Sequence, residues 1–473
     1  MSQPNIILIL ADDMGYGDFG AFNDGKVKTP TLDRLVTESL CLSQHYSGSP
    51  VCSPARASLL TGRYPHRTGA ITPQEVMGLD RISLRETTIA DAFKHGGYAT
   101  GCVGKWHNGA LDDRYHPNAR GFDEFTGFRG GWMDFYNWWL DVNDQRKKTD
   151  GRYITEVLTD AAVDFIHRHS KEPFFLYVPY NAPHSPLQAP EETIQPYVDM
   201  GLSKSVATIY AMIQEMDTGI NRILEKLEQE DLTNNTIVMM SSDNGPAFNH
   251  RPDQVEPGTP TQSLRHNCGF NGAKGSVYEG GIRVPMIMRW PDGFEGGREI
   301  KDLIHFTDWL PTLLNICNIE RPDGLPLDGH NVLPILQGET LNEAPRRFWQ
   351  LSPYSPPIGH CNAAMRDGAW KLVRPRLNIP FATPEGNDLA KRYVEMDIEY
   401  KYNPDNVTLM RDPMPEHIIP DPEAPELFNI DDDPLEQKNI AANHPDRVSR
   451  MLTQLETWFE EVETDRQTIP SEW

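Results

Sequence analysis

The sequence predicts an α/β protein with a large, mostly parallel sheet that carries helices on both faces, followed by a smaller C-terminal α+β domain with a short antiparallel sheet. The first observation is an alternation of helical segments with apolar runs of strand length, which cover 5–10, 98–103, 174–180 and 236–241. The second is a change of pattern after about residue 345, where short strands gather around turns. We therefore expect an N-terminal domain at 1–345 and a C-terminal subdomain at 346–473.

The composition fits a globular protein and argues against two classes of partner. Of the 473 residues, 38% are hydrophobic and 9% are aromatic, which excludes disorder of the whole chain. The 68 acidic and 44 basic residues give a formal charge of -24, which would repel the phosphates of a nucleic acid. No run approaches the roughly twenty apolar residues that cross a bilayer, so we expect no membrane partner.

We expect neither a leader nor a disulfide framework. The apolar run at 5–10 is short and lacks a basic flank and a cleavage site, so it does not predict a signal peptide. The expected location is cytoplasmic, or periplasmic or secreted if a leader has been removed. The six cysteines include no C-x-x-C pair, which argues against a structural zinc site as well as against disulfides.

The first strand, 5–10, is followed by two adjacent carboxylates, Asp12 and Asp13. Two such groups at the end of a buried strand repel each other unless a cation lies between them. The alternative, a helix cap and a turn residue, explains one aspartate well and the second less well. Residues 29–36 then predict a helix, with a threonine cap and a proline in its first turn.

A cysteine stands at the start of the next predicted helix. Ser53 is a suitable N-cap, Pro54 suits the first helical position, and Gly62 can adopt the left-handed conformation that ends a helix. Cys52 would then lie at the positive end of the helix dipole, where a thiol is acidic and reactive, and Arg56 would lean back toward it. The alternative is an ordinary buried cysteine before a helix.

The later strands also lead to polar residues. Lys105 and His107 follow the second strand, and they project to one side if the chain stays extended. His184 follows the third strand, and Asp243 and Asn244 follow the fourth. The helices that separate these strands are expected at 88–95, 153–169 and 203–229.

These polar residues would meet at one edge of the sheet, because ligands of parallel sheets bind beyond the carboxyl ends of the strands. Four of them are hard oxygen ligands, which favour Ca2+ or Mg2+ over zinc: Asp12, Asp13, Asp243 and Asn244. The cationic side of the site would consist of Arg56, Lys105, His107, His184 and Lys274. A tetrahedral monoanion would be held between the metal and these groups.

Two long segments show no regular period. Residues 122–141 are rich in aromatic side chains, among them Trp132, Trp138 and Trp139, and residues 246–270 form a polar loop rich in proline. The aromatic segment predicts, with about equal weight, a wall that stacks against a sugar or aryl group or a satellite core beneath a long loop.

The last elements of both domains follow from local patterns. A strand at 284–290 and a helix at 306–317 complete the N-terminal domain. Residues 363–373 predict two strands around an Asp-Gly turn. Residues 375–425 predict an acidic connector rich in proline, and a helix follows at 445–462.

Several of these stretches resemble motifs of the type I sulfatases, in the alkaline phosphatase-like superfamily. The stretch C-S-P-A-R at 52–56, followed by L-L-T-G-R at 59–63, resembles the family signature, with Ala55 where many members have serine. Further family motifs are matched at 104–109, 183–184, 272–285 and 425–439. Because these motifs occur in order, the resemblance covers nearly the whole chain.

The resemblance implies that a formylglycine-generating maturase oxidises Cys52 to Cα-formylglycine, whose hydrate attacks sulfur. It implies a metal site formed by Asp12, Asp13, Asp243, Asn244 and residue 52, with Ca2+ favoured and Mg2+ as the alternative. Asp243 is the implied proton acceptor in the attack, while the metal and Arg56 hold the nucleophile.

The resemblance also implies the second half of the reaction. His184, helped by Lys274, would protonate the departing alcohol, and Lys105 would bind the sulfate. His107 would take the proton from the second hydroxyl of the hydrate, which expels sulfate. The expected activity is therefore that of a sulfuric ester hydrolase that cleaves a small-molecule or oligosaccharide sulfate, either a carbohydrate or an aryl ester.

Selectivity is expected to come from the rim of the pocket, because the shared motifs fill the sulfate site. The predicted substrate-binding residues are Trp132, Trp138, Trp139, His360 and Arg376. Two alternatives to a sulfatase stay open. One is a formylglycine-dependent phosphonate monoester or phosphodiester hydrolase, and the other is a sulfate-binding protein without turnover, if Cys52 is unmodified.

Overall fold

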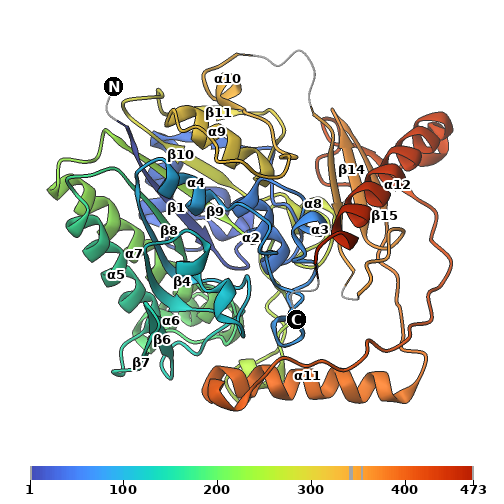
Figure 1. The fold of residues 1–473 in the computed structure, drawn as a ribbon, viewed down its shortest axis with the longest axis horizontal. Helices are drawn as coiled ribbons and strands as arrows, with labels where there is room; N and C mark the ends of the chain where they lie inside the picture. Colours follow the sequence, from blue (N-terminus) through green and yellow to red (C-terminus); the bar gives the residue numbers. More distant parts are fainter. Residues whose placement is uncertain (1–2, 340–344, 353–354, 471–473) are drawn as a thin grey trace.

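The computed structural model describes residues 3–339, 345–352 and 355–470, and its main feature is a ten-stranded sheet with the order β11-β2-β10-β9-β1-β8-β4-β5-β6-β7 (Figure 1). The parallel centre comprises β9 (Thr236–Ser242), β1 (Asn5–Ala11), β8 (Phe174–Pro179), β4 (Ala99–Lys105) and β5 (Glu124–Phe128). The outer strands are β10 (Met286–Arg289), β2 (Leu40–Leu42), β11 (Arg298–Ile300), β6 (Trp139–Val142) and β7 (Gln145–Lys148). The four predicted strands are confirmed as part of the parallel centre.

Helices cover both faces of this sheet, as predicted. Alternate residues of a strand point to opposite faces, so Ile7 and Ile9 of β1 enter one hydrophobic core and Ile6 and Leu8 enter another. The first core contains residues of α1 (Pro30–Glu38), α5 (Ile154–Arg168), α6 (Glu191–Asp199) and α7 (Lys204–Gln229). The second contains residues of α2 (Cys52–Thr61), α4 (Ile89–His95), α9 (Trp309–Ile316) and α10 (Leu333–Leu336).

A four-stranded antiparallel sheet follows in the C-terminal part of the chain, which confirms the predicted fold class. Its strands are β13 (Arg347–Gln350), β14 (Ala363–Asp367), β15 (Trp370–Arg374) and β16 (Glu426–Asn429). Helix α12 (Pro445–Gln467) packs against it (Figure 1). Two short helices, α3 (Pro65–Thr68) and α8 (Glu279–Ile282), and the pair β3 (His45–Tyr46) and β12 (Ile304–His305) complete the chain. The boundary at 345/346 stays a prediction.

Of the described helices that were not expected from the sequence, α11 is the longest. Helix α11 (Pro384–Tyr402) lies within the segment 375–425, so the prediction of a connector is wrong for these residues. The helix runs along the lower edge of the molecule in Figure 1. Most of its side chains are exposed or half-buried, which explains the weak apolar pattern, yet Asp397 and Lys401 are buried. Within the described ranges, no helix is both long enough and apolar enough to cross a membrane.

A buried histidine in β3 makes the stability of the fold depend on pH. The indole N–H of Trp309 donates to His45 Nε2 at 3.0 Å, and His45 Nδ1 lies 3.2 Å from the carbonyl oxygen of Val284. The ring is therefore held as the neutral tautomer with its proton on Nδ1. Burial lowers the pKa of His45 from 6.5 to about 3.

We predict that His45 destabilises the fold in acid. Between pH 6.5 and pH 3, His45 binds a proton in the unfolded chain but not in the folded chain. The stabilisation of the fold by the neutral ring is therefore complete above pH 6.5 and is lost as the pH falls toward 3. Over this range the free energy of unfolding changes by about 1.4 kcal/mol per pH unit. Denaturant unfolding of the wild type and of His45→Asn over this range measures it. The variant should show a smaller slope of unfolding free energy against pH, and an equal slope would contradict the prediction.

Candidate active site

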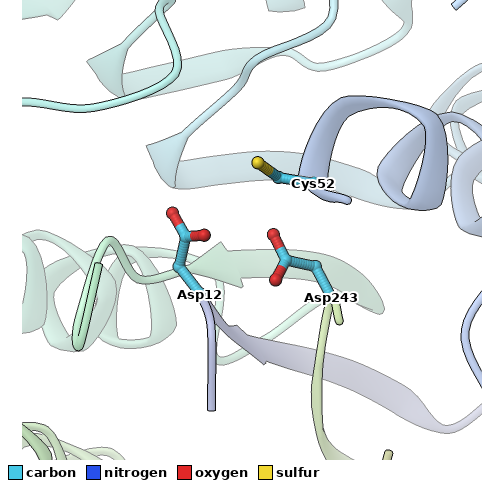
Figure 2. Close-up of side chains that lie close together, drawn as sticks. All are labelled: Asp12, Cys52 and Asp243. Atoms are coloured by element: carbon cyan, nitrogen blue, oxygen red, sulfur yellow. The ribbon is translucent and has the colours of Figure 1, made fainter. Parts of the chain in front are cut away.

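Cys52 is the first residue of α2, and it lies at the carboxyl edge of the sheet (Figure 2). The helix begins earlier than predicted: Val51 is the N-cap, and the hydroxyl of Ser53 donates instead to the carbonyl oxygen of Asp80 at 2.9 Å. The predicted capping role of Ser53 is therefore wrong, because the hydroxyl of Ser53 finds a buried acceptor in the carbonyl oxygen of Asp80. Gly62 follows the helix with a φ of 68°, as predicted.

The thiol of Cys52 is not acidic in this environment. Burial raises its pKa above the ordinary value, and the nearby Lys105 and Lys274 oppose this effect only in part. The prediction of an acidic thiol is wrong because it considered the helix dipole and the cations but not the loss of water around a side chain that is 2% exposed. An unmodified thiol at this position would be a poor nucleophile, since the thiolate is the reactive form.

The register of the sheet brings four oxygen-bearing side chains together. Strands β1 and β9 are parallel neighbours, so the residues that follow them leave the sheet side by side. The backbone N–H of Asp13 donates to Asp243 Oδ1 at 3.2 Å, and the side-chain amide of Asn244 donates to Asp13 Oδ1 at 2.8 Å. Figure 2 shows the carboxylates of Asp12 and Asp243 next to each other below the thiol.

These oxygens fit a hard divalent cation. Single ligand atoms of Asp12, Cys52 and Asp243 lie within 4.8 Å of one another. In addition, Asp12 Oδ1 and Asn244 Oδ1 are buried without a hydrogen-bond partner among the described residues. Such acceptors are costly in a protein interior unless a ligand satisfies them, and carboxylate and amide oxygens are ligands that Ca2+ and Mg2+ prefer.

Three cationic side chains from different elements face these carboxylates. The pairs are Arg56 Nη2 with Asp243 Oδ2 at 2.8 Å, Lys105 Nζ with Asp12 Oδ2 at 2.5 Å and Lys274 Nζ with Asp13 Oδ1 at 2.7 Å. Arg56 comes from the helix that begins at Cys52, Lys105 from the end of β4, and Lys274 from the loop before α8. The structure thus brings together the predicted anionic and cationic residues in one buried cluster.

The two sides of this cluster shift each other's protonation. Burial raises the pKa of Asp13, but Lys274 and His184 outweigh this effect, and the pKa is held below its ordinary value. Burial and then the carboxylate of Asp12 raise the pKa of Asp243 to about 6, although Arg56 opposes both. Asp13 is therefore a fixed anion, whereas Asp243 can take up a proton near neutral pH.

The two predicted histidines present one free ring nitrogen each. His184 Nδ1 lies 2.6 Å from the carbonyl oxygen of Ser185, and its Nε2 lies 3.7 Å from Asp13 Oδ2. His107 adopts a φ of 54°, so the chain does not stay extended as far as His107, which was the condition for Lys105 and His107 to project to one side. Its Nε2 lies 3.1 Å from the carbonyl oxygen of Pro73, and its Nδ1 is buried without a partner among the described residues.

The aromatic segment matches the satellite-core interpretation better than a stacking wall. Trp138 and Trp139 are buried in the first hydrophobic core, and their indole N–H groups donate to the carbonyl oxygens of Arg152 and Lys401. These two indoles are therefore not presented to a substrate. Trp132 is 7% exposed, and its indole N–H donates to Asp397 Oδ2 at 2.9 Å.

Arg376, one of the two predicted C-terminal rim residues, lies near the loop that carries Lys274. The guanidinium of Arg376 is exposed, and its Nη1 is 3.8 Å from the point where a Cβ on Gly275 would lie. The backbone N–H of Gly275 donates to the carbonyl oxygen of Pro50, which ties this loop to the segment before Cys52. His360 is half-buried, and its Nε2 is buried without a partner among the described residues.

A group of charged residues next to His107 was not predicted from the sequence. Single ligand atoms of Glu75, Asp80 and His107 lie within 4.8 Å of one another, and Lys401 of α11 contacts Glu75. Glu75 and Asp80 lie in a segment without helical or strand period, and Lys401 lies in the supposed connector. No local signal in the sequence brings these residues together.

Comparisons with known proteins agree with this geometry. A family model described as Sulfatase matches residues 4–319, and one described as N-sulphoglucosamine sulphohydrolase, C-terminal, matches residues 269–383. Arylsulfatase H of Canis lupus familiaris is 30% identical over 425 residues, which covers 71% of this chain and 73% of that protein. N-acetylgalactosamine-6-sulfatase of Homo sapiens is 34% identical over 369 residues, which covers 72% of this chain and 67% of that protein.

A solved structure supports the same assignment over almost the whole chain. The crystal structure of Ps i-CgsB in complex with k-i-k-neocarrahexaose is similar with a TM-score of 0.80 and 26% sequence identity, covering 99% of this chain and 94% of that chain. Sulfatases generally use a formylglycine and a divalent metal ion, and the cysteine and the buried oxygens described above fit both. The chain belongs to the sulfatase family of the alkaline phosphatase-like superfamily and is a sulfuric ester hydrolase.

Proposed function

We propose that this enzyme hydrolyses sulfate esters of carbohydrates or aryl alcohols with a formylglycine made from Cys52 and a bound Ca2+, with Mg2+ as the alternative ion. The observation that carries the proposal is that single ligand atoms of Cys52, Asp12 and Asp243 lie within 4.8 Å of one another. Buried cations surround this meeting point and can hold a sulfate group opposite the metal.

The hydrated aldehyde of a formylglycine offers one hydroxyl that attacks sulfur and a second hydroxyl through which sulfate is expelled. Asp243 lies where it can accept the proton of the attacking hydroxyl, because single ligand atoms of Asp243 and Cys52 lie within 4.8 Å of each other. Arg56 holds the carboxylate of Asp243 in place through Nε and Nη2 at 3.0 and 2.8 Å. A divalent cation held by Asp12, Asp13, Asp243, Asn244 and residue 52 would supply positive charge at this point.

Two histidines carry out the two further proton transfers. One gives a proton to the departing alcohol, and the other accepts a proton from residue 52. His184 protonates the departing alcohol from Nε2, because its Nδ1 is occupied by the Ser185 carbonyl. Burial and Lys274 lower the pKa of His184 to about 3, so the ring is neutral near neutral pH, and Nε2 would have to receive a proton in the complex with the anionic substrate before it can donate one. His107 takes up a proton at its unpartnered Nδ1, and Lys105 binds a sulfate oxygen.

The substrate is proposed to be a sulfated saccharide in preference to a simple aryl ester. One relative is an N-acetylgalactosamine-6-sulfatase, and the structure of Ps i-CgsB holds an oligosaccharide. Arg376, His360 and the half-buried parts of loop 246–270 offer polar and cationic groups outside the sulfate pocket. A maturase in the source cell would have to supply the formylglycine.

We predict that Cys52→Ala and Cys52→Ser abolish turnover of an aryl sulfate while the circular dichroism spectrum is retained. Serine keeps one hydroxyl but lacks the second, so a transferred sulfate would stay trapped. Intact mass spectrometry of the active wild type should give a mass roughly 18 Da below the gene-encoded value, as expected for conversion of the thiol to an aldehyde. Full turnover by Cys52→Ala would exclude the formylglycine.

The ratio of kcat/KM for an aryl sulfate to kcat/KM for the matching aryl phosphonate completes this test. We expect the ratio to exceed one. A ratio below one would replace the sulfatase by the phosphonate hydrolase alternative, and a wild type with an intact thiol and no turnover of either ester would favour a sulfate-binding protein.

Removal of the metal should lower activity, and Ca2+ or Mg2+ should restore it while Zn2+ should not, because the donors are oxygens. Elemental analysis after gel filtration should show loss of bound metal in Asp12→Ala, Asp13→Ala and Asp243→Ala. Asp217→Ala is the matched control, since Asp217 is also buried but accepts from backbone N–H groups of α1. A full equivalent of metal in all three site variants would show that the ion binds elsewhere.

We expect two kinds of residue among those predicted to form the rim: some bind substrate, and others stabilise the fold. Arg376→Ala should raise KM for a sulfated oligosaccharide without changing Tm, because the side chain is exposed. Trp138→Ala should lower Tm and leave KM unchanged for the folded fraction, since a large buried side chain is lost from the core. Lys171→Ala is the control for charge alone, because it removes an exposed cation at the opposite edge of the sheet. A normal KM in Arg376→Ala would remove Arg376 from the rim.

A further inference from the structure

We propose that Glu75, held by Lys401 of α11, is a positioning residue that orients His107 and stabilises its protonated form during the release of sulfate. This inference rests on the proposed function, in which His107 accepts a proton at Nδ1. It connects the unexpected helix α11 to the chemistry of the site.

The carboxylate of Glu75 lies against the imidazole on the side away from the free nitrogen. Its Oε2 is 3.9 Å from His107 Nε2 and also accepts the backbone N–H of Gly131. Glu75 is 1% exposed and His107 is 2% exposed, so water does not screen this contact. The charge of Glu75 therefore acts directly on the ring.

The same surroundings select one tautomer of His107. Because Nε2 lies 3.1 Å from the carbonyl oxygen of Pro73, it must carry the proton, and Nδ1 is left as the acceptor. Gly131 packs against the same end of the ring so closely that a Cβ there would lie 2.7 Å from Cε1 and Nε2. The ring is therefore enclosed at this end, and a proton that reaches Nδ1 creates a positive charge next to Glu75.

Helix α11 supplies the partner that keeps Glu75 in place. Lys401 is fully buried, its Nζ contacts Glu75 Oε1, and it lies 3.1 Å from Asp397 Oδ1. Asp397 in turn accepts the indole N–H of Trp132 at 2.9 Å. Buried ions are costly, and an apolar pair of similar size would stabilise the helix contact at least as well. If the charge of Glu75 acts on His107, this role accounts for the buried Lys401 on a helix that is otherwise largely exposed.

The step that depends on this arrangement follows the departure of the alcohol. A proton moves from the free hydroxyl of residue 52 to His107 Nδ1, the C–O bond to sulfate breaks as the C=O bond forms, and sulfate leaves with the electron pair. Loss of the Glu75 charge should slow this step, whereas the earlier attack and the binding of substrate should continue.

The test uses the double variant Glu75→Gln/Lys401→Met, which removes both charges, while Asp397 keeps its contacts with the indole of Trp132 and with Arg251 Nη1 at 3.5 Å. With an aryl sulfate, the first equivalent of alcohol should appear at the wild-type rate, and later turnovers should be slower by roughly tenfold or more. Intact mass of the quenched variant should show one retained sulfate, and KM should not rise. Equal slowing of the first and later turnovers, or normal turnover, would overturn the proposal.

Lys371→Met is the matched control, because it removes another fully buried lysine from ion pairs with Glu279 and Glu436, each at 2.8 Å. It should lower Tm without retention of sulfate. Should the double variant fold poorly, histidine-selective 15N NMR of the wild type provides the second measurement, with the His107 signal assigned from His107→Ala. A proton on Nε2 is expected, and a proton on Nδ1 would overturn the proposal.

The outcomes also separate this inference from the proposed function. If Cys52 carried no formylglycine, the wild type itself would show the thiol mass and no turnover. A wild type with the aldehyde and normal turnover, combined with a double variant that shows no accumulated sulfate, would contradict only the role of Glu75.

Discussion

Ion pairs buried at the carboxyl edge of the sheet are the interactions on which the rest of the site depends. The anionic members are Asp12, Asp13 and Asp243, and the cationic members are Arg56, Lys105 and Lys274; all of them are buried except Lys274, which is half-buried. Each charge alone would cost several kcal/mol to bury, so each is tolerable only because an opposite charge lies beside it. These six charges sum to zero, so a bound divalent cation would supply the excess positive charge that a small anion needs on a chain whose formal charge is -24.

The parallel sheet explains how side chains from distant segments reach one point. β1, β9, β4 and β8 lie in the centre of the sheet, and each releases its functional residues within a few positions of its carboxyl end. These strands are buried on both faces, so their ends are held rigidly. A site built on such ends is ordered before substrate arrives, which is the condition for electrostatic catalysis.

Two segments of the C-terminal part of the chain lie beside residues of the site. Arg376 follows β15 and lies next to Gly275, beside the loop of Lys274. Lys401 of α11 reaches Glu75, beside His107. These contributions come from segments outside the large sheet, where length and composition can vary without loss of the catalytic core. In our proposals, the edge of the large sheet carries the sulfate chemistry, Lys401 supports it through Glu75, and Arg376 contributes to selectivity.

The sequence by itself determined the four central strands and the longer helices between them, the pair of carboxylates after β1, the pair of ligands after β9 and the cysteine at the start of α2. These features are local, since an apolar run and the residues that follow it are adjacent in the chain. Only the tertiary structure decided the raised pKa of Cys52, the burial of Trp138 and the contact between Glu75 and Lys401, which are separated by 326 positions. Desolvation and pairing depend on side chains that folding brings from far along the chain, and no local pattern records them.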